Sequence, residues 1–102
     1  MSATVVLNLG LKSIRAAVFG ERGDRLSIAY RAIETQMGEG IVEQEPEDWW
    51  RSAATVLDEA LDASHVRSQV AILTVTASAG CLVPLDSDMR PLRNAIMISD
   101  VR

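Results

Sequence analysis

Two polar residues within and just after the first apolar run of this sequence have side chains that could bind a ligand. Asn8 lies within the apolar run 4–10, and Lys12 follows that run in a short turn. An asparagine oxygen can coordinate a cation, and a lysine ammonium can bind phosphate. Both residues also have a structural interpretation, because a buried asparagine needs a hydrogen-bond partner and lysine is usually solvated. The residue types alone leave both roles open.

A second pair of charged residues, Asp100 and Arg102, follows the apolar run 95–98 at the end of the sequence. These two side chains could pair on the surface or face a ligand. The chain has one histidine, His65, and one cysteine, Cys81, which argues against a zinc site. His65 is expected on the solvated surface, and Cys81 is expected to be a small buried apolar side chain.

Three strands are predicted before residue 35. Residues 4–10 are β-branched and aliphatic and end at a glycine, which is typical of a buried strand. Residues 13–19 and 26–30 alternate between apolar and other side chains, which predicts two further strands. The turns between them are short, so the three strands should form an antiparallel meander. Residues 35–44 have no clear period and are interpreted as a loop.

The clearest helical pattern starts at Pro46, a residue favoured in the first turn of helices. Apolar residues then recur at spacings of three and four from Trp49 to the predicted end near residues 63–64. Trp49 or its neighbour Trp50 is expected to pack in the core. Glu43, before the helix, is interpreted as a cap or as a hydrogen-bond partner in the loop.

Residues 69–75 form another β-branched run, predicted to be a strand parallel to the first, and residues 80–85 and 95–98 predict shorter strands. The fold class is therefore α/β: a three-strand antiparallel meander, one amphipathic helix and returning strands. This order resembles the first half of the ribonuclease H-like core shared by actin-like ATPases. The sequence stops on an apolar run, so residues 1–102 are expected to be an incomplete part of a larger domain.

Composition excludes some classes of partner. The 102 residues are 48% hydrophobic and 24% charged, which is ordinary for a soluble globular protein. A net charge of −4 with scattered basic residues disfavours nucleic acid as a partner. No run approaches the ~20 apolar residues of a membrane helix, so no membrane partner is expected and the cytoplasm is the default compartment. Apolar surface left exposed by an incomplete domain could also produce a homodimer.

Four segments in order resemble the N-terminal part of the FGGY carbohydrate kinase family. Residues 7–16 read LNLGLKSIRA, like the family's opening D-x-G-T-[TSG]-S-[VIT]-[RK]-A. Residues 40–50 read GIVEQEPEDWW and are similar to G-W-V-E-Q-[DN]-P-E-[DE]-W-W, the most specific match, which looks most like xylulokinase and ribulokinase. Residues 74–86 and 90–102 resemble the family's T-G-Q-[MS]-[HG] segment and its G-x-P-L-R-P-A-I-x-W-x-D-x-R segment.

The resemblance implies an N-terminal fragment of an ATP-dependent kinase that phosphorylates a small carbohydrate, a pentulose or a polyol. It places Asn8, Gly10, Lys12 and Ser13 on the phosphate and metal side, with Asn8 as the candidate ligand of Mg²⁺. It places Ser78, Ala79, Gly80, Asp100 and Arg102 on the sugar side. The family's catalytic aspartate and second lobe would lie outside this chain. ATP and Mg²⁺ are thus expected to serve the full-length enzyme, and neither should bind tightly to these residues alone.

The sequence departs from the family pattern at positions that carry chemistry. Asn8 replaces the aspartate of the first strand, and residues 11–12 replace a Thr-Thr pair. Ser78 replaces a glutamine, residues 79–80 replace a polar sugar-contacting pair, and Ile98 replaces a tryptophan. The departures leave two hypotheses open: an enzyme with an unusual substrate, or a catalytically inactive kinase-derived module that binds sugar or a protein partner.

Overall fold

Three consecutive strands form the predicted antiparallel meander. The computed structural model describes all residues from Met1 to Arg102, and its first strands are β1 (Ala3–Leu9), β2 (Ser13–Phe19) and β3 (Arg25–Ala32). Leu9 pairs with Ile14 at the end of the β1–β2 hairpin. The apolar alternation seen in the sequence is the alternation of faces along these strands, which is why the strand bounds were predictable.

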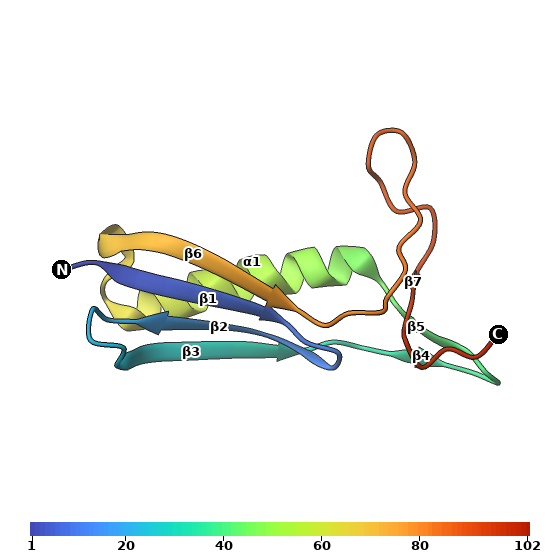
Figure 1. Cartoon of the computed structure of the whole chain (residues 1–102), viewed down its shortest axis with the longest axis horizontal. Coiled ribbons are helices and arrows are strands. Elements are labelled where there is room, and N and C mark those ends of the chain that lie inside the picture. The colour runs from blue at the N-terminus through green and yellow to red at the C-terminus, as the bar shows by residue number, and fades with distance from the viewer.

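A fourth strand, β6 (Val70–Ala77), returns to the sheet and pairs in parallel with β1, giving the order β3-β2-β1-β6. A short 3₁₀ turn, η1 (Arg67–Gln69), leads into it. Figure 1 shows β6 at one edge of the sheet and β3 at the other. The predicted meander, helix and returning parallel strand are confirmed.

The helix α1 (Pro46–Ser64) begins and ends where the sequence predicted. His65 closes it in the left-handed conformation, with φ 61°, and its N–H donates to the carbonyl of Asp62. His65 is exposed, as expected. Trp49 packs against the core, whereas Trp50 points to solvent. None of the helices has the length and apolar character that crossing a bilayer requires.

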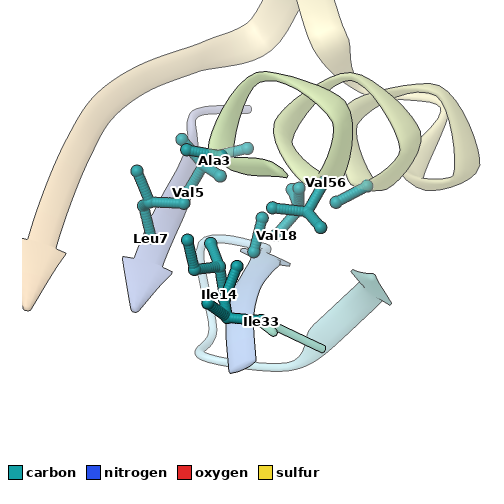
Figure 2. Packing of buried hydrophobic residues seen from close by; sticks show 10 residues of the cluster. Ala3, Val5, Leu7, Ile14, Val18, Ile33 and Val56 are labelled. Carbon is teal, nitrogen blue, oxygen red and sulfur yellow. The ribbon is translucent and has the colours of Figure 1, made fainter. Parts of the chain in front are cut away.

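The core lies between α1 and one face of the sheet. Alternate residues of β1 and β2, such as Val5, Leu7, Ile14 and Val18, face Val56 on the helix (Figure 2). Small residues of the helix complete the contact, because Ala53 and Ala60 are also buried. The helix packs mainly over β2 and β3, and β6 lies outside its main contacts.

A second, smaller sheet corrects two of the sequence-based predictions. It has the order β4-β5-β7 and consists of β4 (Gln36–Met37), β5 (Val42–Gln44) and β7 (Ala95–Ile96). The segment 35–44 was therefore wrongly predicted to be only a loop. The predicted strand 80–85 does not form either, since its residues make isolated bridges only, Leu82 with Ile96 and Leu85 with Pro91. Pro84 lacks the N–H that a continuous ladder needs.

Candidate functional site

The turn between β1 and β2 contains the predicted phosphate-side residues. Gly10 donates its N–H to the carbonyl of Ser13 at 2.9 Å, and a Cβ on Gly10 would lie 2.9 Å from that same oxygen, so the turn requires glycine. The N–H groups of Leu11 and Lys12 make no hydrogen bond within the chain, and the Lys12 side chain is exposed. Free backbone N–H groups beside an ammonium group are a suitable arrangement for binding phosphate oxygens.

Asn8 is exposed, so the interpretation of this residue as a buried, hydrogen-bonded asparagine is wrong. It lies on the sheet face opposite α1, where it pairs with Arg15 on one side and Thr76 on the other. No group of three His, Cys, Asp or Glu side chains comes together anywhere in the chain. One neutral amide oxygen does not supply the oxygen-rich ligand set that Mg²⁺ prefers, so these residues alone do not fit a magnesium site.

Gln44 is the residue of this site to which the sequence analysis assigned no role. It is 2% exposed, and its Nε2 donates to the carbonyl of Leu11 at 2.6 Å and to Oγ1 of Thr35 at 3.0 Å. Its Oε1 accepts the indole N–H of Trp49 at 2.9 Å. One buried amide thus connects the phosphate-side turn to the start of α1. Gln44 lies within residues 40–50, the segment that best resembles the family, and this position was the sequence signal that could have indicated its role.

A cavity of about 310 Å³ lies beside this turn. Gly10 lines it together with Gln44, Trp49 and the segment 77–81, which begins at the last residue of β6. The structure therefore brings three predicted sugar-side residues, Ser78, Ala79 and Gly80, next to the phosphate-side glycine. Cys81 also lines the cavity and is partly buried, whereas a buried side chain was expected.

The backbone conformation of Gly80 shapes the segment 77–81. Its φ of +86° favours glycine. A Cβ at this position would also come within 2.6 Å of the Cδ1 atom of Ile98, because the Ile98 side chain packs directly over the glycine. The glycine at position 80 and the isoleucine at position 98, both departures from the family pattern, are therefore structurally linked, because the Ile98 side chain occupies the space that a side chain at position 80 would need.

Asp100 and Arg102, the other predicted sugar-side residues, do not line this cavity. They pair, as one interpretation of the sequence predicted, but the Asp100 side chain is only 3% exposed. Asp100 Oδ2 accepts the N–H of Val42 at 2.9 Å, and Oδ1 accepts the N–H of Arg102 at 3.0 Å. The Arg102 guanidinium also contacts Glu43. These groups bind the C-terminal segment to β5.

Glu43 acts as a hydrogen-bond partner, as predicted, and not as the helix cap, which is Glu45. Besides Arg102, it accepts from Arg93 at 2.8 Å and from the Asn94 amide at 3.4 Å. We call Glu43, Arg93, Asp100 and Arg102 the ionic clamp. Its carboxylates join residues 50 or more positions apart in the sequence, because Glu43 contacts both Arg93 and Arg102.

The clamp should make the protein less stable in acid. The guanidinium of Arg102 holds the pKa of Asp100 far below its usual range, helped by the N–H of Val42, and the Arg102 hydrogen bond also lowers the pKa of Glu43. Both carboxyls bind protons more weakly when folded than unfolded. Their stabilisation is complete above the unfolded pKa values and is lost as the pH falls through about 4 and below.

We therefore expect the thermal midpoint of the wild-type chain to fall between pH 6 and pH 3, and Asp100→Asn to flatten that dependence. Asp88→Asn is the matched control, because Asp88 is exposed and its side chain makes no ion pair. Thermal unfolding followed by circular dichroism at each pH measures both effects. Equal pH dependence in Asp100→Asn and the wild type would contradict the role given to the clamp.

Comparisons with known proteins place this geometry in a family. Residues 3–102 match the FGGY family of carbohydrate kinases, N-terminal domain. The chain is 36% identical over 101 residues to a glycerol kinase of Koribacter versatilis, covering 96% of this chain and 20% of the relative. It is 28% identical over 106 residues to a xylulose kinase of Bacillus subtilis, covering 100% of this chain and 21% of the relative.

A solved xylulose kinase structure from Rhodospirillum rubrum superposes with a TM-score of 0.88 at 26% identity, covering 98% of this chain and 21% of that one. The chain spans about a fifth of the length of these relatives. Its meander, helix and returning strand are those of the actin-like N-terminal domain of such kinases. The chain therefore belongs to the FGGY family of carbohydrate kinases and is a segment of that N-terminal domain.

Proposed function

We propose that this chain forms one wall of the active site of an ATP-dependent kinase that phosphorylates a small carbohydrate, a pentulose or a polyol, in the cytoplasm. The observation that carries the proposal is the contact between the two candidate subsites. Gly10 of the phosphate-side turn lines the same cavity as Ser78, Ala79 and Gly80. A sugar hydroxyl in that cavity, the group that receives the phosphoryl group of ATP, would lie beside the phosphate-side turn.

The residues of this chain would act mainly by positioning, which is the larger part of phosphoryl-transfer catalysis. The free N–H groups of Leu11 and Lys12, with the Lys12 ammonium, would hold phosphate oxygens. Bound ATP supplies the phosphoryl group. Gln44 would hold the turn in place through the carbonyl of Leu11. Residues 1–102 are in this proposal the N-terminal part of the first domain, and the catalytic aspartate and second lobe belong to the remainder of the kinase.

The alternative is a catalytically inactive, kinase-derived module that binds sugar or a protein partner. The observation that favours it is Asn8, an uncharged and exposed side chain where the resemblance implies a metal-binding aspartate. The two functions differ in what a longer polypeptide containing this chain would do. In an active kinase, sugar binding and ADP release occur together, whereas the inactive module retains only the first.

We expect the 102-residue chain alone to release no measurable ADP, because one wall cannot enclose the reacting groups. A coupled assay with ATP, Mg²⁺ and a panel of pentuloses and polyols measures this. Thermal unfolding with the same panel measures binding, since a ligand specific to the folded state adds about 2.7 kcal/mol of stability at a hundredfold excess over its Kd. Steady, pentulose-dependent ADP release from this chain would contradict the expectation of inactivity.

The strand β6 is the surface that we propose for the partner of this segment. It is an edge strand whose residues from Ala71 onward are exposed, and it has no charged residue. The opposite edge, β3, carries Arg25 and Arg31, and charges of this kind protect edges from pairing. In the full-length kinase the remaining lobe would cover β6. In the isolated chain we propose that a second copy covers it.

The strand is suited to pairing with itself. In an antiparallel pair centred on Thr74, Leu73 of each copy would face Val75 of the other, so both cross-strand pairs on the α1 side are apolar. We expect the chain to be a dimer at micromolar concentration and Val75→Lys to be a monomer. Ile28→Lys is the control, because Ile28 is 48% exposed and Val75 is 54% exposed on the same sheet. Light scattering after size-exclusion chromatography measures the molar mass of the wild type and of both variants. A wild type that is still monomeric at a concentration 100-fold above the micromolar range would overturn the proposal.

A further inference from the structure

The cavity beside the phosphate-side turn has an unusual wall for a site that is to hold a carbohydrate. Eight of its twelve lining residues are hydrophobic. None of the lining residues is charged. The side chains at and after the end of β6 are small or apolar, with Ala77, Ala79 and Val83 on the wall and Met97 beside them.

The polar side chains of the cavity are already engaged. Both ends of the Gln44 amide are bonded, and one of them accepts the only N–H of the Trp49 side chain. The Ser78 hydroxyl donates to the carbonyl of Leu9 at 3.4 Å and retains its capacity to accept. The backbone N–H groups of residues 79–81 make no hydrogen bond within the chain. The wall therefore presents the free backbone N–H donors of residues 79–81, and the rest of its surface is mainly hydrocarbon.

A ligand hydroxyl pressed against the hydrocarbon part of this wall would lose its water without gaining a partner, which is unfavourable. A methyl or methylene group at the same place would gain from leaving water. An oxygen elsewhere on the ligand could still accept from the free N–H groups of residues 79–81. The wall thus matches a neutral molecule with one apolar end and one oxygen-bearing edge.

We propose that the substrate of this site is a deoxy sugar or deoxy polyol, whose methyl or methylene group lies against Ala77, Ala79, Val83 and Met97. This inference rests on the proposed function and narrows its substrate class. A sugar acid does not suit the wall, since no lining residue carries a positive charge.

The test uses the 102-residue chain and two pairs of ketoses that differ in one hydroxyl: 1-deoxy-D-xylulose with D-xylulose, and L-fuculose with L-tagatose. Saturation-transfer NMR titrations give the Kd of each sugar. We expect at least one deoxy member to bind about tenfold or more tightly than its hydroxylated partner, the discrimination that one such group gives in an apolar pocket.

Two variants test whether the preference for the deoxy sugar comes from the apolar wall of the cavity. Val83→Thr keeps the side-chain shape and adds a hydroxyl in the cavity, so it should reduce the ratio of the two Kd values. Val101→Thr makes the same change at an exposed residue outside the cavity and should leave the ratio unchanged.

Equal or tighter binding of the hydroxylated members would overturn the inference and leave the proposed sugar kinase intact. Binding of no sugar would also overturn it, because the inference places the recognising wall in this chain. That result would not affect the proposed function, which is decided by sugar-dependent ADP release from a longer polypeptide containing this segment. An equal preference in Val83→Thr would show that the methyl group lies elsewhere.

Discussion

Replacing Gln44 by alanine is expected to lower the free energy of unfolding by about 3 kcal/mol. The substitution leaves the carbonyl of Leu11 and the indole N–H of Trp49 without the partner that the buried Gln44 amide supplies. Each buried polar group left unpaired costs about 1–3 kcal/mol. Urea unfolding followed by tryptophan fluorescence measures the loss, and Trp49 itself reports on the altered contact.

Two further variants separate the hydrogen bonds of Gln44 from its bulk. Gln69→Ala is the matched control, because Gln69 is exposed and its side chain makes no hydrogen bond, so its effect should stay within about 0.5 kcal/mol. Gln44→Glu keeps the size of the side chain and the acceptor for Trp49, but replaces the donor to Leu11 by an oxygen. It should be at least as destabilising as Gln44→Ala at neutral pH. Equal stability of Gln44→Ala and Gln69→Ala would show that the buried amide does not hold the turn.

The reason why Gln44 escaped prediction is that its partners are distant in sequence. Local periodicity predicts which face of a strand or helix is apolar, and it correctly gave β1, β2, α1 and β6. A buried amide has no such period. Its role depends on a turn 33 residues earlier, at Leu11, which only the packed structure brings within reach.

Two strands of the small sheet, β4 and β5, were missed for a related physical reason, whereas β7 lies within the strand predicted at residues 95–98. The strands of this sheet contain two or three residues each, too few to show an alternation. They exist because β7 pairs with β5 across about 50 residues of sequence, Glu43 with Ile96. The segment 80–85 was overpredicted because apolar, β-branched composition was read as a strand, although Pro84 and the positive φ of Gly80 interrupt any ladder there.

The candidate site was predictable to the extent that it is built from neighbouring residues. Residues 78–80 follow β6, and the parallel pairing of β6 with β1 brings them beside Gly10. Asp100 and Arg102 were assigned to the sugar side by resemblance. Their side chains form the ionic clamp, in which the Asp100 carboxylate accepts the N–H of Val42, 58 residues away, and their sugar-side role stays a prediction. The local sequence around a carboxylate does not predict how many hydrogen-bond partners the fold brings to it, because some of those partners are distant in the sequence.

Replacing Ile14 by alanine should have an effect similar in size to that of Gln44→Ala. Ile14 is 1% exposed and is among the largest fully buried side chains of the chain. It lies under α1 with Val18 and Val56 (Figure 2) and its other side lines the sugar-side cavity. Truncating a buried isoleucine to alanine costs about 2–5 kcal/mol, the removed hydrocarbon contact plus the space left behind.

In a chain of this size 1 kcal/mol corresponds to about 4–8 °C in the thermal midpoint, so Ile14→Ala should lower the midpoint by more than about 8 °C. Ile28→Ala removes the same atoms from the neighbouring strand, where the side chain is exposed, and should change stability by no more than about 0.5 kcal/mol. Differential scanning calorimetry of both variants and the wild type measures the three thermal midpoints. A midpoint for Ile14→Ala close to that of Ile28→Ala would mean that the core under α1 does not hold the sheet.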